Sequence, residues 1–186
     1  MLLCSLSRLR YFVEDHEAAY SYGQQSLRIA QETGDPTWQA EALYSLGQAL
    51  TGLGQLAEAF NAYQRRLELH RETFPPEILI STQAALANIL RIQGDLGRAM
   101  SYVEDVLVFL EDHPFDGSHL PFWRHLLCYR VLKAVKDPRG PAVLNTAHTL
   151  LQNLAARIGD DDLRRSYLEN MVINREIVEE WTKLGL

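Results

Sequence analysis

The sequence has few cysteines, no long apolar run and no excess of positive charge, and each absence excludes a class of protein. Two cysteines in 186 residues are too few for a disulfide-stapled secreted scaffold. No apolar run approaches the roughly 20 residues that a membrane-spanning helix needs. The formal net charge of −6 leaves no surplus of Lys and Arg for nucleic-acid phosphates. We therefore expect a cytoplasmic protein that contacts neither nucleic acid nor membrane directly.

Motifs of catalysis are missing as well. The sequence contains no phosphate-binding loop, zinc-protease helix, CxxC pair or GxSxG elbow. We expect no enzymatic activity and no cofactor. The apolar start, MLLCSLSRLRYF, is interrupted by Arg8 and Arg10 and lacks a cationic leader and a cleavage site. It predicts a helix and not a signal peptide.

Some weaker groupings have a structural explanation. His113, His119 and His125 are spaced by six residues, which matches no known ligand pattern, so we expect no metal site. The acidic run at 160–162 favours the start of a helix, where negative charge is stabilising. The remaining residues recur at helical spacing and are predicted to be core: Cys4, Cys128, Tyr44, Tyr63, Phe122 and Trp123.

What the chain does have is an internal repeat of 40 residues. Three segments align at this interval: Glu14–Tyr20, Gly54–Phe60 and Gly94–Met100. Ala19, Ala59 and Ala99 therefore recur in phase. A fixed period of this length is typical of stacked helical units, which cannot bury their apolar faces alone.

Each copy predicts two helices joined by a tight turn. In the second copy, Asp35-Pro36 is a helix start and Gly54 suits the left-handed turn at the end of that helix. The apolar residues of both helices then fall at 3/4 spacing: Leu43, Leu46, Leu50, Leu56, Phe60, Tyr63 and Leu67. Small residues allow the two helices to approach closely: Gly47 and Ala87 on the first helix, Ala59 and Ala99 on the second.

The pattern resembles the tetratricopeptide repeat on these residues: Leu46-Gly47, Leu50, Gly54, Ala59, Tyr63 and Leu67. The 40-residue period is similar to the lengthened repeats of bacterial multidomain signalling and transcription regulators. The first copy departs from the pattern, with Glu14 for the turn glycine and Gly23 for the aromatic residue, and the third has Val103 for that aromatic. Arg66 stands where a small residue is usual, so we expect that helix to be more exposed or longer there.

The resemblance implies an all-α fold, a right-handed α-solenoid of antiparallel helix pairs. We expect one domain over 1–186, with about four pairs and C-terminal capping helices. The predicted repeats span about 1–34, 35–74, 75–113 and 119–158, and the capping helices 160–186. In the final helix, about 173–184, some residues should face inward and others outward. The inward set is Ile173, Ile177, Trp181 and Leu184, and the outward set is Glu176, Glu179, Glu180 and Lys183.

In such a stack, the first helix of each pair lines a concave groove. The residues predicted to face that groove are Arg8, Tyr11, Tyr44, Gln48, Asn88, Arg91, Arg130 and Lys133. The resemblance implies that Asn88 holds a peptide backbone, because family members often use Asn at this position. Four of these residues are cations and none is an acid, so an acidic peptide or partner domain suits the groove.

The leading hypothesis is a non-enzymatic protein-interaction module, the C-terminal sensor or scaffold part of a bacterial signalling or transcription regulator. One alternative is a receptor for a peptide or small ligand, which a deep and mostly apolar concavity would favour. Another is self-association into a homodimer, because the apolar start has no polar capping segment before it. The same uncapped start would also be expected of a fragment of a longer chain. The face involved carries Leu2, Leu3, Leu6 and Leu9.

Overall fold

Ten helices and no strand make up the part of the chain that the computed structural model describes, residues 2–70, 76–113 and 121–185. The helices are α1 (Leu2–Phe12), α2 (His16–Thr33), α3 (Pro36–Gly52), α4 (Leu56–His70), α5 (Pro76–Gln93), α6 (Leu96–Asp112), α7 (Pro121–Val135), α8 (Gly140–Ala155), α9 (Asp161–Asn170) and α10 (Val172–Leu184). Helices α1 to α8 pack as four consecutive pairs, and each pair contacts the next. The predicted all-α solenoid of helix pairs is confirmed.

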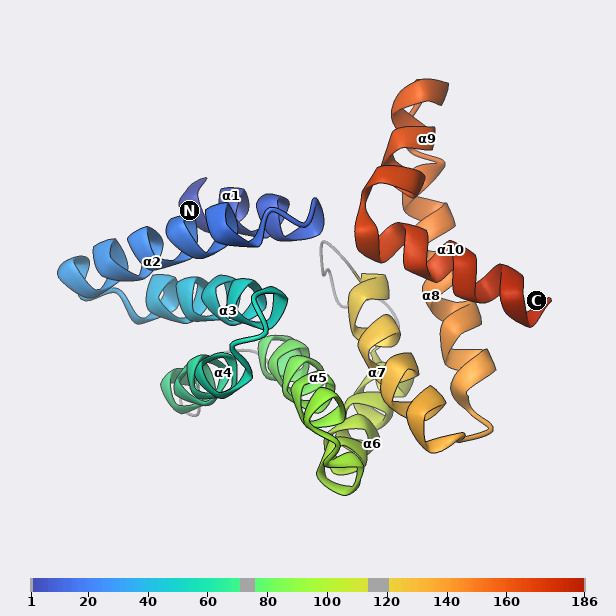
Figure 1. Cartoon of the computed structure of the whole chain (residues 1–186), viewed down its shortest axis with the longest axis horizontal. Coiled ribbons are helices and arrows are strands. Elements are labelled where there is room, and N and C mark those ends of the chain that lie inside the picture. The colour runs from blue at the N-terminus through green and yellow to red at the C-terminus, as the bar shows by residue number, and fades with distance from the viewer. Residues whose placement is uncertain (1, 71–75, 114–120, 186) are drawn as a thin grey trace.

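The helix pairs follow an arc that brings the first pair near α10, while the N and C ends of the chain lie on opposite sides of the view (Figure 1). We call α1–α4 the N-terminal arm and α5–α10 the C-terminal arm. The turn between α1 and α2 comes close to the start of α10, where the Glu14 carboxylate lies 3.6 Å from the Arg175 guanidinium. Helix α9 projects from the far end of the C-terminal arm and has no buried residue.

The same left-handed turn ends the first helix of all four pairs. The turn residues have positive φ angles: 63° at Glu14, 74° at Gly54, 85° at Gly94 and 57° at Lys136. In each turn the following N–H donates at 2.9 Å to the carbonyl five residues earlier: Asp15 to Arg10, Gln55 to Leu50, Asp95 to Leu90 and Asp137 to Leu132. Glu14 therefore takes the conformation that glycine takes in the second and third pairs, although a side chain makes it less favourable.

Aspartates cap two of the helices that follow these turns, α2 and α6. The Asp15 carboxylate accepts from the Ala18 N–H at 3.3 Å, and the Asp95 carboxylate accepts from the Arg98 N–H at 3.2 Å. Asp160 caps α9 in the same way, through the Leu163 N–H at 2.8 Å. The expectation that the acidic run at 160–162 starts a helix is thus confirmed.

Small residues let the helices of a pair approach closely. Ala19, Ala59 and Ala99 are fully buried in the second helices of their pairs. At Gly47 the fit within the pair is tight, because a Cβ there would lie only 2.7 Å from the ring of Tyr63 on α4. The buried Tyr63 ring therefore fills the space that a side chain at position 47 would need.

Arg66 corrects the expectation of an exposed or longer helix, because its side chain is buried at the joint between the arms and only 3% of its surface is exposed. Its guanidinium donates to the Thr82 hydroxyl of α5 at 2.9 Å and to the Glu41 carboxylate of α3 at 3.0 Å. It also lies 4.2 Å from the centre of the Tyr44 ring. Burial lowers the pKa of Arg66, and the nearby Glu41 carboxylate opposes that shift. A buried cation is tolerated because α3 and α5 both supply partners for it.

We predict that Gly47→Ala lowers the free energy of unfolding by about 1–3 kcal/mol, because the new Cβ forces the Tyr63 ring out of its place. Gly97→Ala is the matched control, since a Cβ at this helical position of α6 meets nothing within 4 Å. That substitution should leave stability unchanged or raise it by up to about 1 kcal/mol. Urea unfolding followed by circular dichroism measures both. Equal effects of the two substitutions would contradict the tight fit.

Arg66→Ala should destabilise the fold by about 2–3 kcal/mol, because it removes one member of a largely buried ion pair and leaves Glu41 and Thr82 without this donor. The neighbouring Arg65 is exposed, so Arg65→Ala changes the same charge and should cost less than about 0.5 kcal/mol. The comparison uses the same denaturant titration. A cost of Arg66→Ala no larger than that of Arg65→Ala would refute the role of Arg66 at the joint.

Candidate partner-binding cleft

Four of the eight predicted groove residues line a cleft of about 380 Å³ between the arms: Tyr11, Asn88, Arg91 and Arg130. They come from α1, α5 and α7, so the turn register does bring these first helices to one place. Glu14, His16 and Glu176 line the same cleft, and sequence reasoning did not assign them to it. Of the other predicted residues, Arg8 is partly exposed and Lys133 is exposed, and both lie outside this lining.

Tyr44 and Gln48 differ from their predicted place in the groove because they are buried, with 7% and 2% of their surface exposed, and for Tyr44 this agrees with its other prediction as a core residue. The arms meet above them: the rings of Tyr11 and Phe12 lie edge-on to the ring of Trp123 on α7, with centres 6.1 Å and 6.0 Å apart. Neither Tyr44 nor Gln48 is accessible to a partner in this structure.

Arg91 is the cleft cation without an ion pair among the described residues. Its Nε and Nη2 both donate to the Asn88 side-chain oxygen at 3.1 Å. Burial lowers the pKa of Arg91, the charge of Arg130 lowers it further, and the Glu176 carboxylate acts in the opposite direction. A half-buried guanidinium with one amide partner retains donors for an acceptor from outside.

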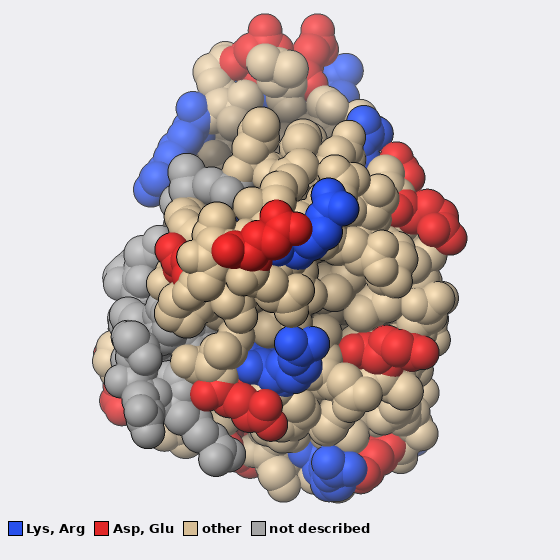
Figure 2. All heavy atoms as spheres, turned by 90° about the vertical axis from the view of Figure 1, so that its left-hand side faces the viewer, with Lys and Arg blue, Asp and Glu red and all other residues tan. Residues whose placement is uncertain are grey.

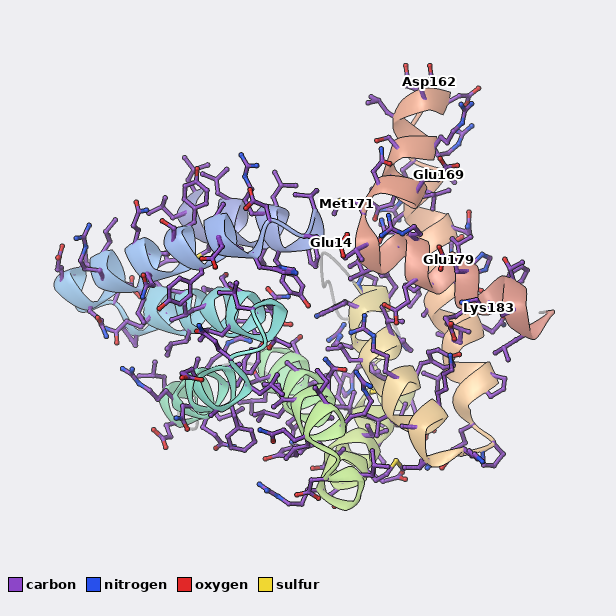
Figure 3. The ribbon with its side chains drawn as sticks, in the orientation of Figure 1. Glu14, Asp162, Glu169, Met171, Glu179 and Lys183 are labelled. Atoms are coloured by element: carbon purple, nitrogen blue, oxygen red, sulfur yellow. The ribbon has the colours of Figure 1, made fainter. Side chains whose placement is uncertain are left out.

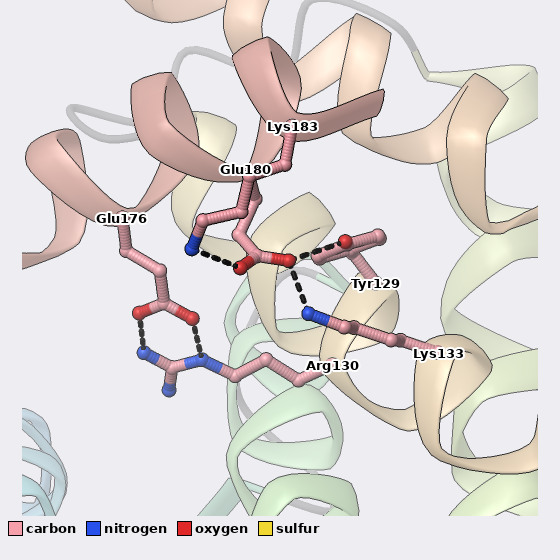
Figure 4. Close-up of polar contacts among 6 residues, drawn as sticks. All are labelled: Tyr129, Arg130, Lys133, Glu176, Glu180 and Lys183. Atoms are coloured by element: carbon pink, nitrogen blue, oxygen red, sulfur yellow. Dashed lines mark hydrogen bonds and ion pairs between the residues drawn. The ribbon is translucent and has the colours of Figure 1, made fainter. Parts of the chain in front are cut away.

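The other two cations near the cleft already bind carboxylates of α10 (Figure 4). The Arg130 guanidinium forms a two-pronged pair with the Glu176 carboxylate, with Nε donating at 2.8 Å and Nη2 donating to the second oxygen. Glu180 accepts from the Lys133 ammonium, from the Tyr129 hydroxyl at 2.7 Å and from Lys183 at 3.0 Å. The expected groove of cations without acids is therefore wrong at its C-terminal end.

The predicted faces of α10 need the same correction. Ile173 and Ile177 are buried as expected, and their packing turns the edge with Glu176 and Glu180 toward α7 instead of solvent. Trp181 stacks on His148 of α8 at 4.1 Å between ring centres, whereas Leu184 is exposed. The sequence does contain a matching pattern, since Glu176 and Glu180 are four residues apart and Arg130 and Lys133 are three apart. The pattern predicts ion pairs only once the orientation of α10 on α7 is known.

The charge contacts keep Glu180 ionised. Burial alone would raise the pKa of Glu180, but hydrogen bonds from Lys133, Tyr129 and Lys183 outweigh it and lower the pKa to about 2. Burial and the contact with Glu180 raise the pKa of the Tyr129 hydroxyl, so that group stays protonated. The network thus joins an anion to a neutral donor and two cations at neutral pH.

Other chemistry considered from the sequence does not gather into a site in the described residues. The imidazoles of His113 and His125 contact carbonyl oxygens of their own helices, at 3.1 Å and 3.0 Å, and His119 lies outside the described residues. No group of three His, Cys, Asp or Glu side chains suited to a metal is found in that part of the chain. Cys4 and Cys128 are buried, and burial raises the pKa of the Cys128 thiol to about 12.

Two surfaces outside the cleft bear on the remaining hypotheses. On α1, Leu2 and Leu9 are 72% and 51% exposed, while Leu3 and Leu6 are half-buried. On the face shown in Figure 2, acidic and basic side chains are intermingled among uncharged ones. None of the helices in the described residues is long and apolar enough to cross a membrane.

The two arms also meet at the outer edge of the cleft. Figure 3 places Glu14, at the turn that ends α1, beside Met171 at the junction of α9 and α10. The ion pair between Glu14 and Arg175 is exposed on both sides, with more than a third of each side chain accessible. Such a pair contributes little to stability, so it does not hold the arms together strongly.

Comparison with known proteins agrees with this architecture. Residues 1–72 match the family model described as tetratricopeptide repeat. The crystal structure of BtubC (BKLC) from P. vanneervenii is 19% identical and matches 97% of this chain and 73% of its own, with a TM-score of 0.62. A Podosopora anserina structure, described as kinesin light chain nearly identical TPR-like repeats, is 15% identical and matches 97% of this chain and 87% of its own, with a TM-score of 0.59. At such identities the likeness is one of fold. No curated protein gives a significant match.

The Glu180 network predicts a pH dependence. The pKa of Glu180 in the folded chain, about 2, lies below the ordinary value of 4.5. The stabilisation by ionised Glu180 is therefore complete above pH 4.5 and is lost as the pH falls toward 2. Glu180→Gln should lower stability at neutral pH, and its unfolding free energy should converge with that of the unmodified chain near pH 2. The difference in slope is at most about 1.4 kcal/mol per pH unit. Glu179→Gln, at an exposed neighbour, should run parallel to the unmodified chain in urea titrations, and convergence of both variants would contradict the assignment.

Proposed function

We propose that this chain, whose residues 1–72 match the tetratricopeptide-repeat family model, is a non-enzymatic protein-interaction module whose partner binds at the cleft between its arms. Such repeats generally mediate contacts between proteins. The observation that carries the assignment to the cleft is Arg91, a half-buried cation without an ion pair among the described residues. The partner supplies the missing acceptor as a peptide segment or as part of a folded domain.

The chemistry of the cleft favours an acidic side chain on the partner. A carboxylate beside Arg91 would form a charge-assisted hydrogen bond in a setting that is partly shielded from water. Arg130 and Lys133 are already paired with Glu176 and Glu180. The initial contact is therefore with one acid at Arg91, and not with an acidic run along the whole groove.

The lining also bears on the choice between a protein partner and a small ligand. The cleft volume lies within the range of about 300–1,000 Å³ that is usual for ligand pockets. Its lining, however, includes four charged side chains, from Glu14, Arg91, Arg130 and Glu176. A charged lining of this kind favours a polar protein segment over an apolar small molecule.

Self-association is a second proposal, carried by the exposed leucines of α1. In α3, Ala42 and Ala49 align with Leu2 and Leu9, and both alanines are buried. The α1 positions therefore belong to a face that another helix covers in the next pair. A second copy of the chain would supply that cover.

We further propose that the module is the sensor or scaffold part of a bacterial signalling or transcription regulator in the cytoplasm. Its sequence resemblance to lengthened repeats supports this context. Partner binding would act by favouring one assembly state, which requires unequal affinity for the two states. The reading frame around the coding sequence tests this proposal, because it should encode a nucleotide-binding or DNA-binding domain in the same chain.

Arg91→Gln should weaken binding of a partner peptide at least tenfold. Peptides are first selected from a random library against the unmodified chain and then titrated by calorimetry. Arg98→Gln, which removes an exposed cation of α6 outside the cleft lining, should leave their affinity unchanged. Circular dichroism should show the same helix content in both variants. Selected peptides that bind both variants equally well would contradict the placement of the partner at Arg91.

A further inference from the structure

Helix α10 lies against α7 at positions that the repeat marks as partner-facing. Counting back six and three residues from the left-handed turn gives a pair of positions in each first helix: Arg8 and Tyr11, Gln48 and Thr51, Asn88 and Arg91, Arg130 and Lys133. In α7 both of these residues bind glutamates of α10. In α5 the same two residues bind each other. The fourth pair thus shows how this surface holds an acidic segment.

The bound segment has a definite chemistry. Glu176 and Glu180 are one helical turn apart, so both point to the cations of α7, as Figure 4 shows. Ile173 and Ile177 lie on the adjacent edge of α10 and are buried. The surface of α7 therefore recognises an amphipathic helix with two carboxylates four residues apart beside an apolar edge.

The second half of α10 is held mainly by polar and aromatic contacts. Beyond Ile177, Val178 and Trp181 are partly buried against the core, and the other contacts are those of Glu180, the Trp181 stack on His148, and a hydrogen bond of 3.1 Å from the Trp181 indole to Asn145. Leu184 is exposed at the end of the helix. No residue of this half is fully buried among the described residues, whereas Ile173 and Ile177 are, so it can leave α7 at lower cost than the half anchored by the isoleucines.

We infer that α10 is an internal ligand of this surface and competes with the partner, which is itself an acidic amphipathic helix with the same spacing of carboxylates. This inference rests on the proposed function, since it names the partner class and the regulation of that cleft. The partner first contacts Arg91, then displaces Glu180 from Lys133 as the second half of α10 leaves, and finally exchanges with the Glu176 side chain on Arg130 at the edge of the anchored half. Two further cations, both on α7, become available to it when their carboxylate partners on α10 are displaced.

The test uses a fluorescent peptide with the sequence of residues 171–185 as its probe. Its binding to the full chain is measured by anisotropy for the unmodified protein, for Glu176→Gln with Glu180→Gln, and for the control Glu179→Gln. The double variant loosens its own α10 and leaves the α7 cations intact, so it should bind the peptide at least tenfold more tightly than the other two. Equal affinities for all three proteins would overturn the inference.

Two further measurements test whether the peptide binds at the α7 cations and whether the result holds if the double variant folds poorly. Adding Arg130→Gln and Lys133→Gln to the double variant should abolish binding of the peptide. A peptide with Gln at positions 176 and 180 should not bind the double variant either. In the unmodified chain, excess peptide should accelerate hydrogen exchange of the α10 amides beyond Ile177. Unchanged exchange at saturating peptide would overturn the inference even if the variants proved unstable.

These outcomes are distinct from a failure of the proposed function. The labelled peptide replaces the natural partner, so its exchange with α10 does not depend on which peptides a library yields. If library peptides ignore Arg91 while the labelled peptide still displaces α10, the partner site is misplaced and the internal ligand stands. If library peptides need Arg91 but never displace α10, the cleft stands and the competition is wrong.

Discussion

The left-handed turn at the end of each first helix is the constraint on which the arrangement of this protein depends. It fixes where the chain reverses, so residues at a given distance before the turn face the same side in every pair. Glu14 and Lys136 adopt it without the freedom of glycine. That conformation costs roughly 1–2 kcal/mol per residue. Its persistence in both non-glycine pairs indicates that helix packing on either side demands the reversal at that residue.

The separation into two arms has a local cause in the joint between the second and third pairs. Direct contact between α3 and α5 is slight, whereas α1 packs on α3 and α5 packs on α7. Arg66 lies at this joint, with its guanidinium between Glu41 on one helix and Thr82 on the other. A long side chain where the repeat usually has a small one keeps these first helices apart. The cleft and its lining follow from that separation.

The sequence predicts what depends on local chemistry and misses what depends on how the arc closes. The turns, the aspartate caps and the buried alanines follow from spacing, because each involves residues near one another in the chain. The meeting of Phe12 with Trp123 and the burial of Tyr44 and Gln48 depend on curvature summed over several pairs. The fold class was therefore predictable, while only half of the proposed groove residues line the cleft.

Charge shows the same limit of sequence reasoning. In α10, both edges of the helix carry glutamates, and only the packing of Ile173 and Ile177 decides which edge meets α7. Arg66 was misjudged for a related reason, since its burial depends on a carboxylate 25 residues away in the chain. Ion pairs of this type join side chains whose neighbourhood is set by tertiary packing. The sequence indicates that such ion pairs form, but it does not predict which residues form them.

The competition between α10 and a partner helix has an energetic requirement that the cleft can meet. An internal helix docks at an effective concentration on the order of millimolar, because it is tethered to its site. A separate helix with identical contacts would lose to it at ordinary concentrations and must gain free energy elsewhere. Arg91 offers that additional contact, since α10 leaves it without a carboxylate in the described structure. The cation that α10 does not pair with is thus the one that allows an external acidic segment to displace it.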